Sequence, residues 1–261
     1  MKRWLECAAV ALAVAMPGRA AARCALPPPP TQRVVLQEGA SSATLTKGRG
    51  NWSGASILAV ARDGNKRSAY VRAADDVRFG RNDNEYEGGA YLAVTPHVIA
   101  DLIGSFSPQH NVLPASSAEG DIDLRAGGGY GYQAGYATRQ YTSVGASIVH
   151  VGMDRYFRDL RLAGTITFAR LSNVPGLALS EGVSMARYLP CDSENFSLST
   201  GRDVENIGFG TPPAVYHSLS LFLGDTHRLS SRIGLAVGMG WYGLTGAYDR
   251  LEVRVALRER L

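Results

Sequence analysis

The fold is decided by residues 233–241, which read IGLAVGMGW. Large apolar side chains stand at every second position, and glycine or alanine fills the positions between them. Side chains repeat with a period of two on a strand and of about 3.6 on a helix. The stretch therefore predicts a β-strand with one large apolar face and one small face, and it excludes an amphipathic helix.

The same alternation continues on both sides of this stretch. Residues 251–258 read LEVRVALR, again with apolar side chains at alternate positions. Fourteen such segments are predicted, with bounds good to a few residues: 33–46, 51–62, 67–79, 84–95, 97–107, 117–126, 130–142, 145–156, 160–170, 178–189, 195–206, 214–228, 232–243 and 247–260. Gly127, Gly128 and Gly129 form either a turn or part of a strand, so twelve strands is the alternative.

The connections between the segments differ in length along the chain. Those after even-numbered segments are short, such as residues 63–66, which read DGNK, a tight hairpin signal. Those after odd-numbered segments tend to be longer, as at 80–83, 108–116, 171–177 and 206–213. Short turns on one rim and longer loops on the other are typical of outer-membrane barrels. We therefore predict an all-β fold, an antiparallel transmembrane up-and-down β-barrel with short periplasmic turns, longer extracellular loops and both ends of the chain on the periplasmic side.

The N-terminus carries an export signal. Lys2 and Arg3 precede an apolar run over residues 7–16, and Ala20–Ala22 offers a cleavage site. Ten apolar residues are too few to span a bilayer as a helix. We predict a signal peptide over 1–22, a Pro-rich periplasmic segment over 23–32, a barrel over 33–261 and export to the outer membrane.

The charge of the mature chain is small. Removing residues 1–22 leaves 24 basic and 22 acidic residues, which lowers the formal charge from +4 to +2. No nucleic-acid partner is expected from this balance.

Two cysteines remain after cleavage, Cys24 and Cys191. The periplasm favours disulfides, and both residues lie on the same predicted rim. A bridge between Cys24 and Cys191 is predicted, with free or intermolecular thiols as the alternative.

Charged side chains of both signs alternate onto the predicted lumen face. They either cross-link a narrow or plugged lumen or line a weakly selective pore. The predicted lumen network comprises Arg72, Glu85, Glu87, Asp101, His150, Asp154, Arg161, Glu252 and Arg254.

No reactive or ligand-binding motif stands out. The five histidines show no H-x-x-x-H or H-E-x-x-H spacing, no serine lies in G-x-S-x-G, and Asp121 and Asp123 lack the twelve-residue calcium-loop pattern. The chain is therefore predicted to be no enzyme, with no catalytic residue, no cofactor and no metal site.

The segment order from Arg33 to Leu261 resembles the YaiO family of outer-membrane β-barrel proteins. The best local matches are GMDRYF at 152–157 with LRL at 160–162, FSP at 106–108 with VLP at 112–114, and SMARYL at 184–189. The resemblance implies an outer-membrane location and a surface-exposed barrel, and it brings no catalytic residues.

The biochemical role stays open at this point. A structural, surface or transport component of the outer membrane is expected, in contact with outer-membrane lipid, lipopolysaccharide and the barrel assembly machinery. The alternatives are an outer-membrane enzyme acting on lipid or glycan, and a secreted soluble β-barrel that binds a ligand. A soluble barrel needs a polar exterior, which distinguishes it from the other two.

Overall fold

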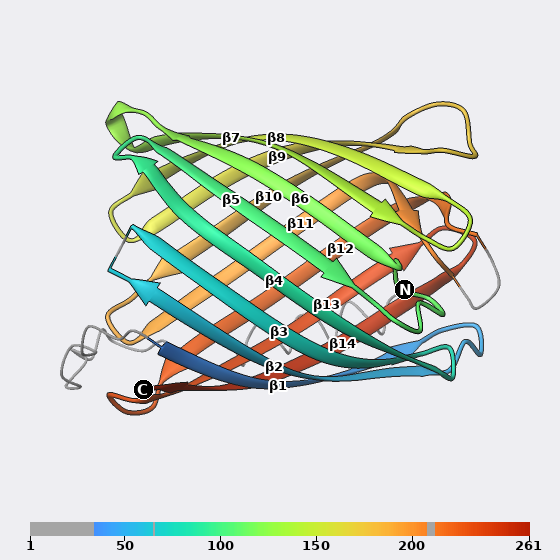
Figure 1. Cartoon of the computed structure of the whole chain (residues 1–261), viewed down its shortest axis with the longest axis horizontal. Coiled ribbons are helices and arrows are strands. Elements are labelled where there is room, and N and C mark those ends of the chain that lie inside the picture. Colours follow the sequence, from blue (N-terminus) through green and yellow to red (C-terminus); the bar gives the residue numbers. More distant parts are fainter. Residues whose placement is uncertain (1–33, 65, 208–211) are drawn as a thin grey trace, which may run out of the picture.

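The computed structural model is a closed barrel of antiparallel strands (Figure 1). It describes residues 34–64, 66–207 and 212–261. The strands in this described part are β1 Val34–Leu45, β2 Asn51–Asp63, β3 Arg67–Arg78, β4 Arg81–Thr95, β5 Val98–Phe106, β6 Ser116–Arg125, β7 Tyr130–Gln140, β8 Gly145–Phe157, β9 Leu160–Leu171, β10 Ala178–Tyr188, β11 Asp192–Glu205, β12 Ala214–Arg228, β13 Ile233–Leu244 and β14 Tyr248–Arg260.

Each strand pairs with its neighbours in sequence, and β1 closes the sheet by pairing with β14. Closure leaves no strand edge unpaired, which a chain in lipid requires because no water is there to satisfy backbone groups. Gly127–Gly129 form a short 3₁₀ turn between β6 and β7, with positive φ at Gly128 and Gly129. This turn separates two strands, so the prediction of fourteen is confirmed and the alternative of twelve is wrong.

The described chain begins and ends at the same end of the barrel. β1 starts and β14 ends at the left of Figure 1, which we call the periplasmic end, and the opposite end is the outer end. The two longest connections, 107–115 and 206–213, both lie at the outer end. One predicted loop was wrong: residues 80–83 form no loop, because Phe79 and Gly80 make a two-residue turn with φ of 52° and 73° and β4 begins at Arg81. Two positive φ values match the type I′ hairpin turn.

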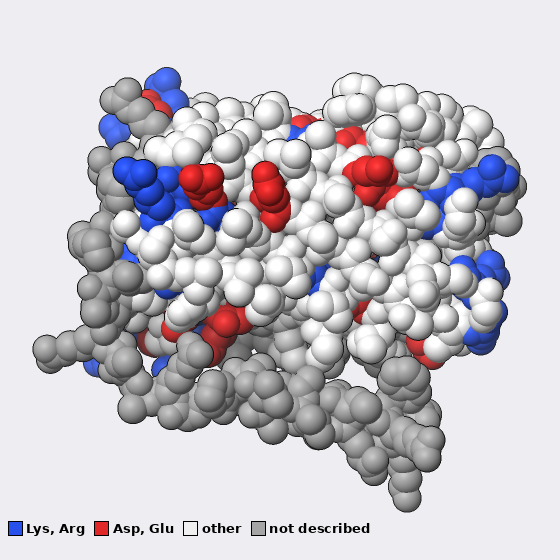
Figure 2. Space-filling model, turned by 90° about the horizontal axis from the view of Figure 1, so that it is seen from below, with Lys and Arg blue, Asp and Glu red and all other residues white. Residues whose placement is uncertain are grey.

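The outward face of the barrel is mostly apolar. Val71 and Leu102 are 64 % exposed and Ile57 is 59 % exposed, all at outward positions of their strands. On the face shown in Figure 2, basic side chains lie mostly at the two ends, and the band between them is mostly uncharged apart from several acidic side chains. A soluble protein does not expose so continuous an apolar surface. The prediction of a lipid-facing exterior is confirmed, and the soluble alternative fails.

No helix in the described part of the chain is long and apolar enough to cross a membrane.

The buried apolar side chains gather at the outer end. One cluster forms around the β7–β8 and β9–β10 connections and includes Tyr141, Val144 and Leu171. A second cluster forms around the β13–β14 connection, where Trp52, Phe79 and Tyr248 pack edge to face with ring centroids 5.2–6.0 Å apart. We refer to these as the outer clusters.

Candidate functional site

The lumen is the candidate site, because the strands turn their polar side chains inward. On β3 the inward positions are Ser68, Tyr70, Arg72, Ala74, Asp76 and Arg78, and the outward ones include Val71 and Val77. All nine residues of the predicted lumen network stand at inward positions of their strands. The structure divides them into separate groups along the wall.

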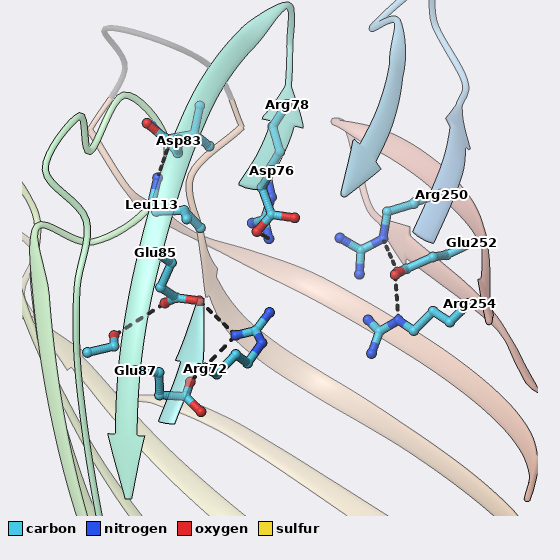
Figure 3. Close-up of polar contacts among 12 residues, drawn as sticks. Arg72, Asp76, Arg78, Asp83, Glu85, Glu87, Leu113, Arg250, Glu252 and Arg254 are labelled. Atoms are coloured by element: carbon cyan, nitrogen blue, oxygen red, sulfur yellow. Dashed lines mark hydrogen bonds and ion pairs between the residues drawn. The ribbon is translucent and has the colours of Figure 1, made fainter. Parts of the chain in front are cut away.

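The first group joins β3 to β4 (Figure 3). Arg72 Nη1 lies 3.0 Å from Glu85 Oε2 and 3.7 Å from Glu87 Oε2. Tyr70 donates a hydrogen bond of 2.9 Å to Glu87, and Ser105 on β5 donates one of 3.2 Å to Glu85. These charges are paired between neighbouring strands.

The second group lies along β14. Glu252 accepts a hydrogen bond of 2.5 Å from Arg254 Nε, and Arg250 Nε lies 3.6 Å from its other oxygen. Arg250 also stacks on Trp52 and Tyr242, at 4.8 and 5.0 Å from the ring centroids. The Arg254 side chain remains 59 % exposed although it points inward, so the lumen at this depth has room for water.

Inward arginines continue down β14 towards the periplasmic end. We call the set of Arg250, Arg254, Arg258 and Arg260 the arginine ladder. Arg258 donates to Gln37 on β1, and the buried Nη1 of Arg260 has no hydrogen-bond acceptor in the described residues. This wall of the lumen is basic.

The third group lies on β5 to β9. Asp154 on β8 pairs with Arg161 on β9 at 3.3 Å, and His150 Nε2 lies 2.6 Å from Asp121 Oδ1 on β6. Asp101 interacts electrostatically with Asp121 and Asp123. We call the inward carboxylates Asp101, Glu119, Asp121, Asp123 and Asp154 the acidic wall.

The acidic wall and the arginine ladder lie on opposite sides of the barrel. In the closed order of fourteen strands, β7 is seven places from β14 in either direction, and the acidic wall occupies the strands around β7. The ion pairs described above join strands that are neighbours or next but one, or residues of a single strand. These pairs run along the wall, and the choice between a cross-linked lumen and a weakly selective pore stays a prediction.

Loops narrow the lumen at its outer end. Asp83 is 1 % exposed, and its carboxylate accepts hydrogen bonds from the backbone N–H groups of Asn111, Val112 and Leu113 at 2.6–3.0 Å. Figure 3 shows the one from Leu113. Asn206 in the β11–β12 connection donates to the carbonyl of Val112, which lies in the β5–β6 connection. The two loops follow β5 and β11, which are six places apart in the closed order of fourteen strands. Their contact therefore crosses the outer opening of the barrel.

Other contacts fix the same region. Arg49 in the β1–β2 connection donates a hydrogen bond of 3.1 Å to the carbonyl of Ile207. Burial in the outer clusters raises the pKa of the Tyr141 phenol above its ordinary value. The outer mouth is therefore a packed structure.

Sequence reasoning missed Asp83, Glu119 and Asp121. Asp83 was assigned to a loop, and Asp121 was weighed only with Asp123. Their roles depend on contacts between segments far apart in the sequence. In the sequence itself, only their place at inward positions of the alternating pattern pointed to them.

The structure describes only one of the two cysteines in the predicted bridge. Cys191 is disulfide-bonded and lies between β10 and β11 at the periplasmic end. Cys24, its predicted partner, lies outside the described residues. The pairing of Cys24 with Cys191 stays a prediction.

Catalytic groupings are not evident in the described residues. No serine hydroxyl is hydrogen-bonded to a histidine ring there, and the ring contacts of His150 and His227 are to Asp121 and Asp192. A nucleophile beside a base would be needed for a serine hydrolase.

Comparisons with known proteins agree with this architecture. A family model described as "YaiO membrane beta barrel domain" matches residues 36–203. No curated protein sequence matches the chain.

Among solved structures, a monoaromatic hydrocarbon channel, CymD, superposes with a TM-score of 0.59 at 9 % identity, covering 88 % of this chain and 89 % of that one. A bacterial polysaccharide outer membrane secretin gives 0.57 at 9 % identity, covering 88 % and 99 %. The outer membrane protein Omp33 of Acinetobacter baumannii gives 0.54 at 10 % identity, covering 88 % and 98 %. At such identities these likenesses concern the fold.

Proposed function

The chain belongs to the YaiO family of membrane β-barrels of the outer membrane, and from that premise we propose that it is a channel for small polar solutes, ions included. Solutes would pass between the acidic wall and the arginine ladder. The observation that carries the proposal is the Arg254 side chain, which points into the lumen and is 59 % exposed there. In a barrel of about eight strands, the side chains just fill the interior. A barrel of fourteen strands is wider, so its side chains leave space.

The pairing of the lumen charges supports the same function. Charges removed from water need partners, and here they find them along the wall. No ion pair among the described residues joins the acidic wall to the arginine ladder, which supports a passage for water and solute between them. Opposed walls of opposite sign create a field across the passage, which favours small polar or dipolar molecules over apolar ones.

Planar-bilayer conductance of the folded full chain tests the proposal. We expect discrete single-channel steps and a weak ion selectivity. Asp123→Asn should shift the reversal potential towards anion preference and Arg254→Gln towards cation preference, because each removes one charge from one wall.

Glu38→Gln is the matched control, since Glu38 stands at an outward, exposed position of β1. It should leave the reversal potential unchanged. A silent bilayer with correctly folded protein would overturn the channel proposal and favour a structural role.

The proposal assigns the chain transport and no catalytic step. The competing function, an outer-membrane enzyme acting on lipid or glycan, is tested by incubating the folded chain with phospholipid vesicles and with cell-surface glycan. Hydrolysis of phospholipid or glycan that increases with the amount of folded protein would overturn this part of the proposal.

A further inference from the structure

We propose that Glu119, Asp121 and His150 form a binding site for a divalent transition-metal cation, of which Zn²⁺ is the test case, in the acidic wall of the lumen. One ligand atom from each of the three residues lies within 4.8 Å of the other two. The site is independent of conduction, because a barrel that passes no solute could still hold the ion.

Register brings these residues together from strands that are not neighbours. Asp121 on β6 is paired with Gly135 on β7, and Gly135 is paired with His150 on β8, so the three form one row across the sheet. A Cβ atom at position 135 would lie 1.7 Å from Asp121 Oδ1 and 2.4 Å from the His150 ring. The absence of a side chain on β7 is therefore what lets the carboxylate and the imidazole meet.

One oxygen of the Asp121 carboxylate is without a hydrogen bond. Asp121 is 8 % exposed, and its Oδ1 is buried with no hydrogen-bond partner among the described residues. His150 Nε2 lies only 2.6 Å away, but the ring N–H is not aligned for a hydrogen bond to this oxygen. A buried carboxylate oxygen without a donor is costly, and a bound cation would satisfy it.

The surroundings leave negative charge uncompensated. Asp101, Glu119 and Asp123 make no ion pair within 4.0 Å in the described part of the chain, although Arg139 and Arg161 act on Glu119 and Asp123 from further away. In contrast, Glu85 and Asp154 each have an arginine within 3.3 Å. The excess of carboxylates therefore centres on Asp121.

The donor set selects the metal class. One imidazole nitrogen with two carboxylate oxygens suits Zn²⁺ and related ions, whereas Mg²⁺ and Ca²⁺ prefer oxygen ligands alone. Bond lengths of about 2.0–2.2 Å in a tetrahedral site hold ligand atoms roughly 3.3 Å apart. The 2.6 Å contact between His150 and Asp121 would open by about 0.7 Å, and lumen water would fill the fourth position.

Zinc titration of the tag-free, folded full chain after chelator treatment tests the site. We expect one Zn²⁺ per chain by calorimetry, and an affinity at least tenfold weaker in His150→Gln, in Glu119→Gln and in Gly135→Ala. Gly135→Ala keeps all three ligands and only fills the space in which they meet. Heat-modifiable migration on gels shows which variants are folded, and any one of the three that folds decides the matter.

Two controls match these variants. Gly131→Ala lies on β7 like Gly135 but crowds a different inward carboxylate, because its Cβ would lie 2.8 Å from Asp154 Oδ1 on β8. His227→Gln removes the ring of the other histidine–aspartate contact, which forms no three-ligand group with a second carboxylate among the described residues. Both should bind Zn²⁺ as the unaltered chain does. Absence of binding, binding that survives in folded His150→Gln, or binding lost in His227→Gln would overturn the site.

Discussion

Loops pack the outer end of the barrel, whereas short turns close the periplasmic end. Both outer clusters and the buried Asp83 belong to the first region. At the periplasmic end the buried side chains of the described residues include Ile99 and Arg228, and no cluster forms there. A loop of several residues can fold over the mouth and bury its own side chains, and a two- or three-residue turn cannot. We infer that the loops set the width of the lumen at the outer end, and that the periplasmic end draws stability from another source, the disulfide of Cys191.

The largest effect on stability is expected from removing the disulfide of Cys191. Cys191→Ser should lower the free energy of unfolding by about 4–5 kcal/mol in the chain-entropy model, because a bridge from Cys24 to Cys191 closes a long loop. Urea titration of the folded barrel with and without reductant measures the change, and non-reducing mass spectrometry identifies the pair. Two freely alkylated thiols in the mature protein would contradict the bridge.

The next largest effect is expected at the outer end, where Asp83 holds the β5–β6 connection. Asp83→Ala should cost about 3–4 kcal/mol, because three buried backbone N–H groups lose a charged acceptor together. Release of the β5–β6 connection should also raise single-channel conductance. Asp159→Ala is the control from the periplasmic end: its side chain is 51 % exposed, and the loss of its contact with Arg187 should change the stability by less than about 0.5 kcal/mol. An Asp83→Ala barrel of unchanged stability and conductance would mean that the loop does not define the mouth.

A smaller effect concerns the lipid-facing band between the two ends. Val255 is outward and 45 % exposed near the middle of β14, so Val255→Arg should cost about 2–3 kcal/mol in lipid. Its neighbour Ala256 faces the lumen, and Ala256→Arg should cost less. The similar pair Val237 and Gly238 is less clean, because a Cβ at Gly238 would lie 2.9 Å from the Phe222 ring. Equal stability of the two β14 variants would show that the inward and outward assignments are wrong.

The strands and their inward positions could be predicted from sequence because both follow from local alternation. Residues 233–241 specify an outward and an inward face with no knowledge of the partner strand, and the nine predicted lumen residues all stand inward. The location in the outer membrane follows from the same apolar outward face. Strand number also followed once Gly127–Gly129 proved to be a turn.

Contacts between strands could not be predicted in this way. Asp121 and His150 meet because three strands align one row of residues and the middle one is Gly135, and nothing local to any of them announces it. Asp83 was placed in a loop because Gly80 read as its start, whereas Phe79 adopts positive φ and the turn ends after two residues. Alternation placed the lumen charges inward, but it could not say which of them pair, as Arg72 does with Glu85.

The prediction with the smallest effect on stability tests which end of the barrel faces the cell exterior. An epitope inserted at 172–177, the β9–β10 connection, should be detected on intact cells without loss of the fold, since Leu177 there is 59 % exposed. The β5–β6 connection is a poorer site than its length suggests, because Val112 and Leu113 are 4 % and 7 % exposed and held by Asp83. An epitope in the turn after Asp63, at the opposite end, should be detected only after the outer membrane is permeabilised. Detection of the second epitope but not the first on intact cells would reverse the barrel, and the packed mouth would then face the periplasm.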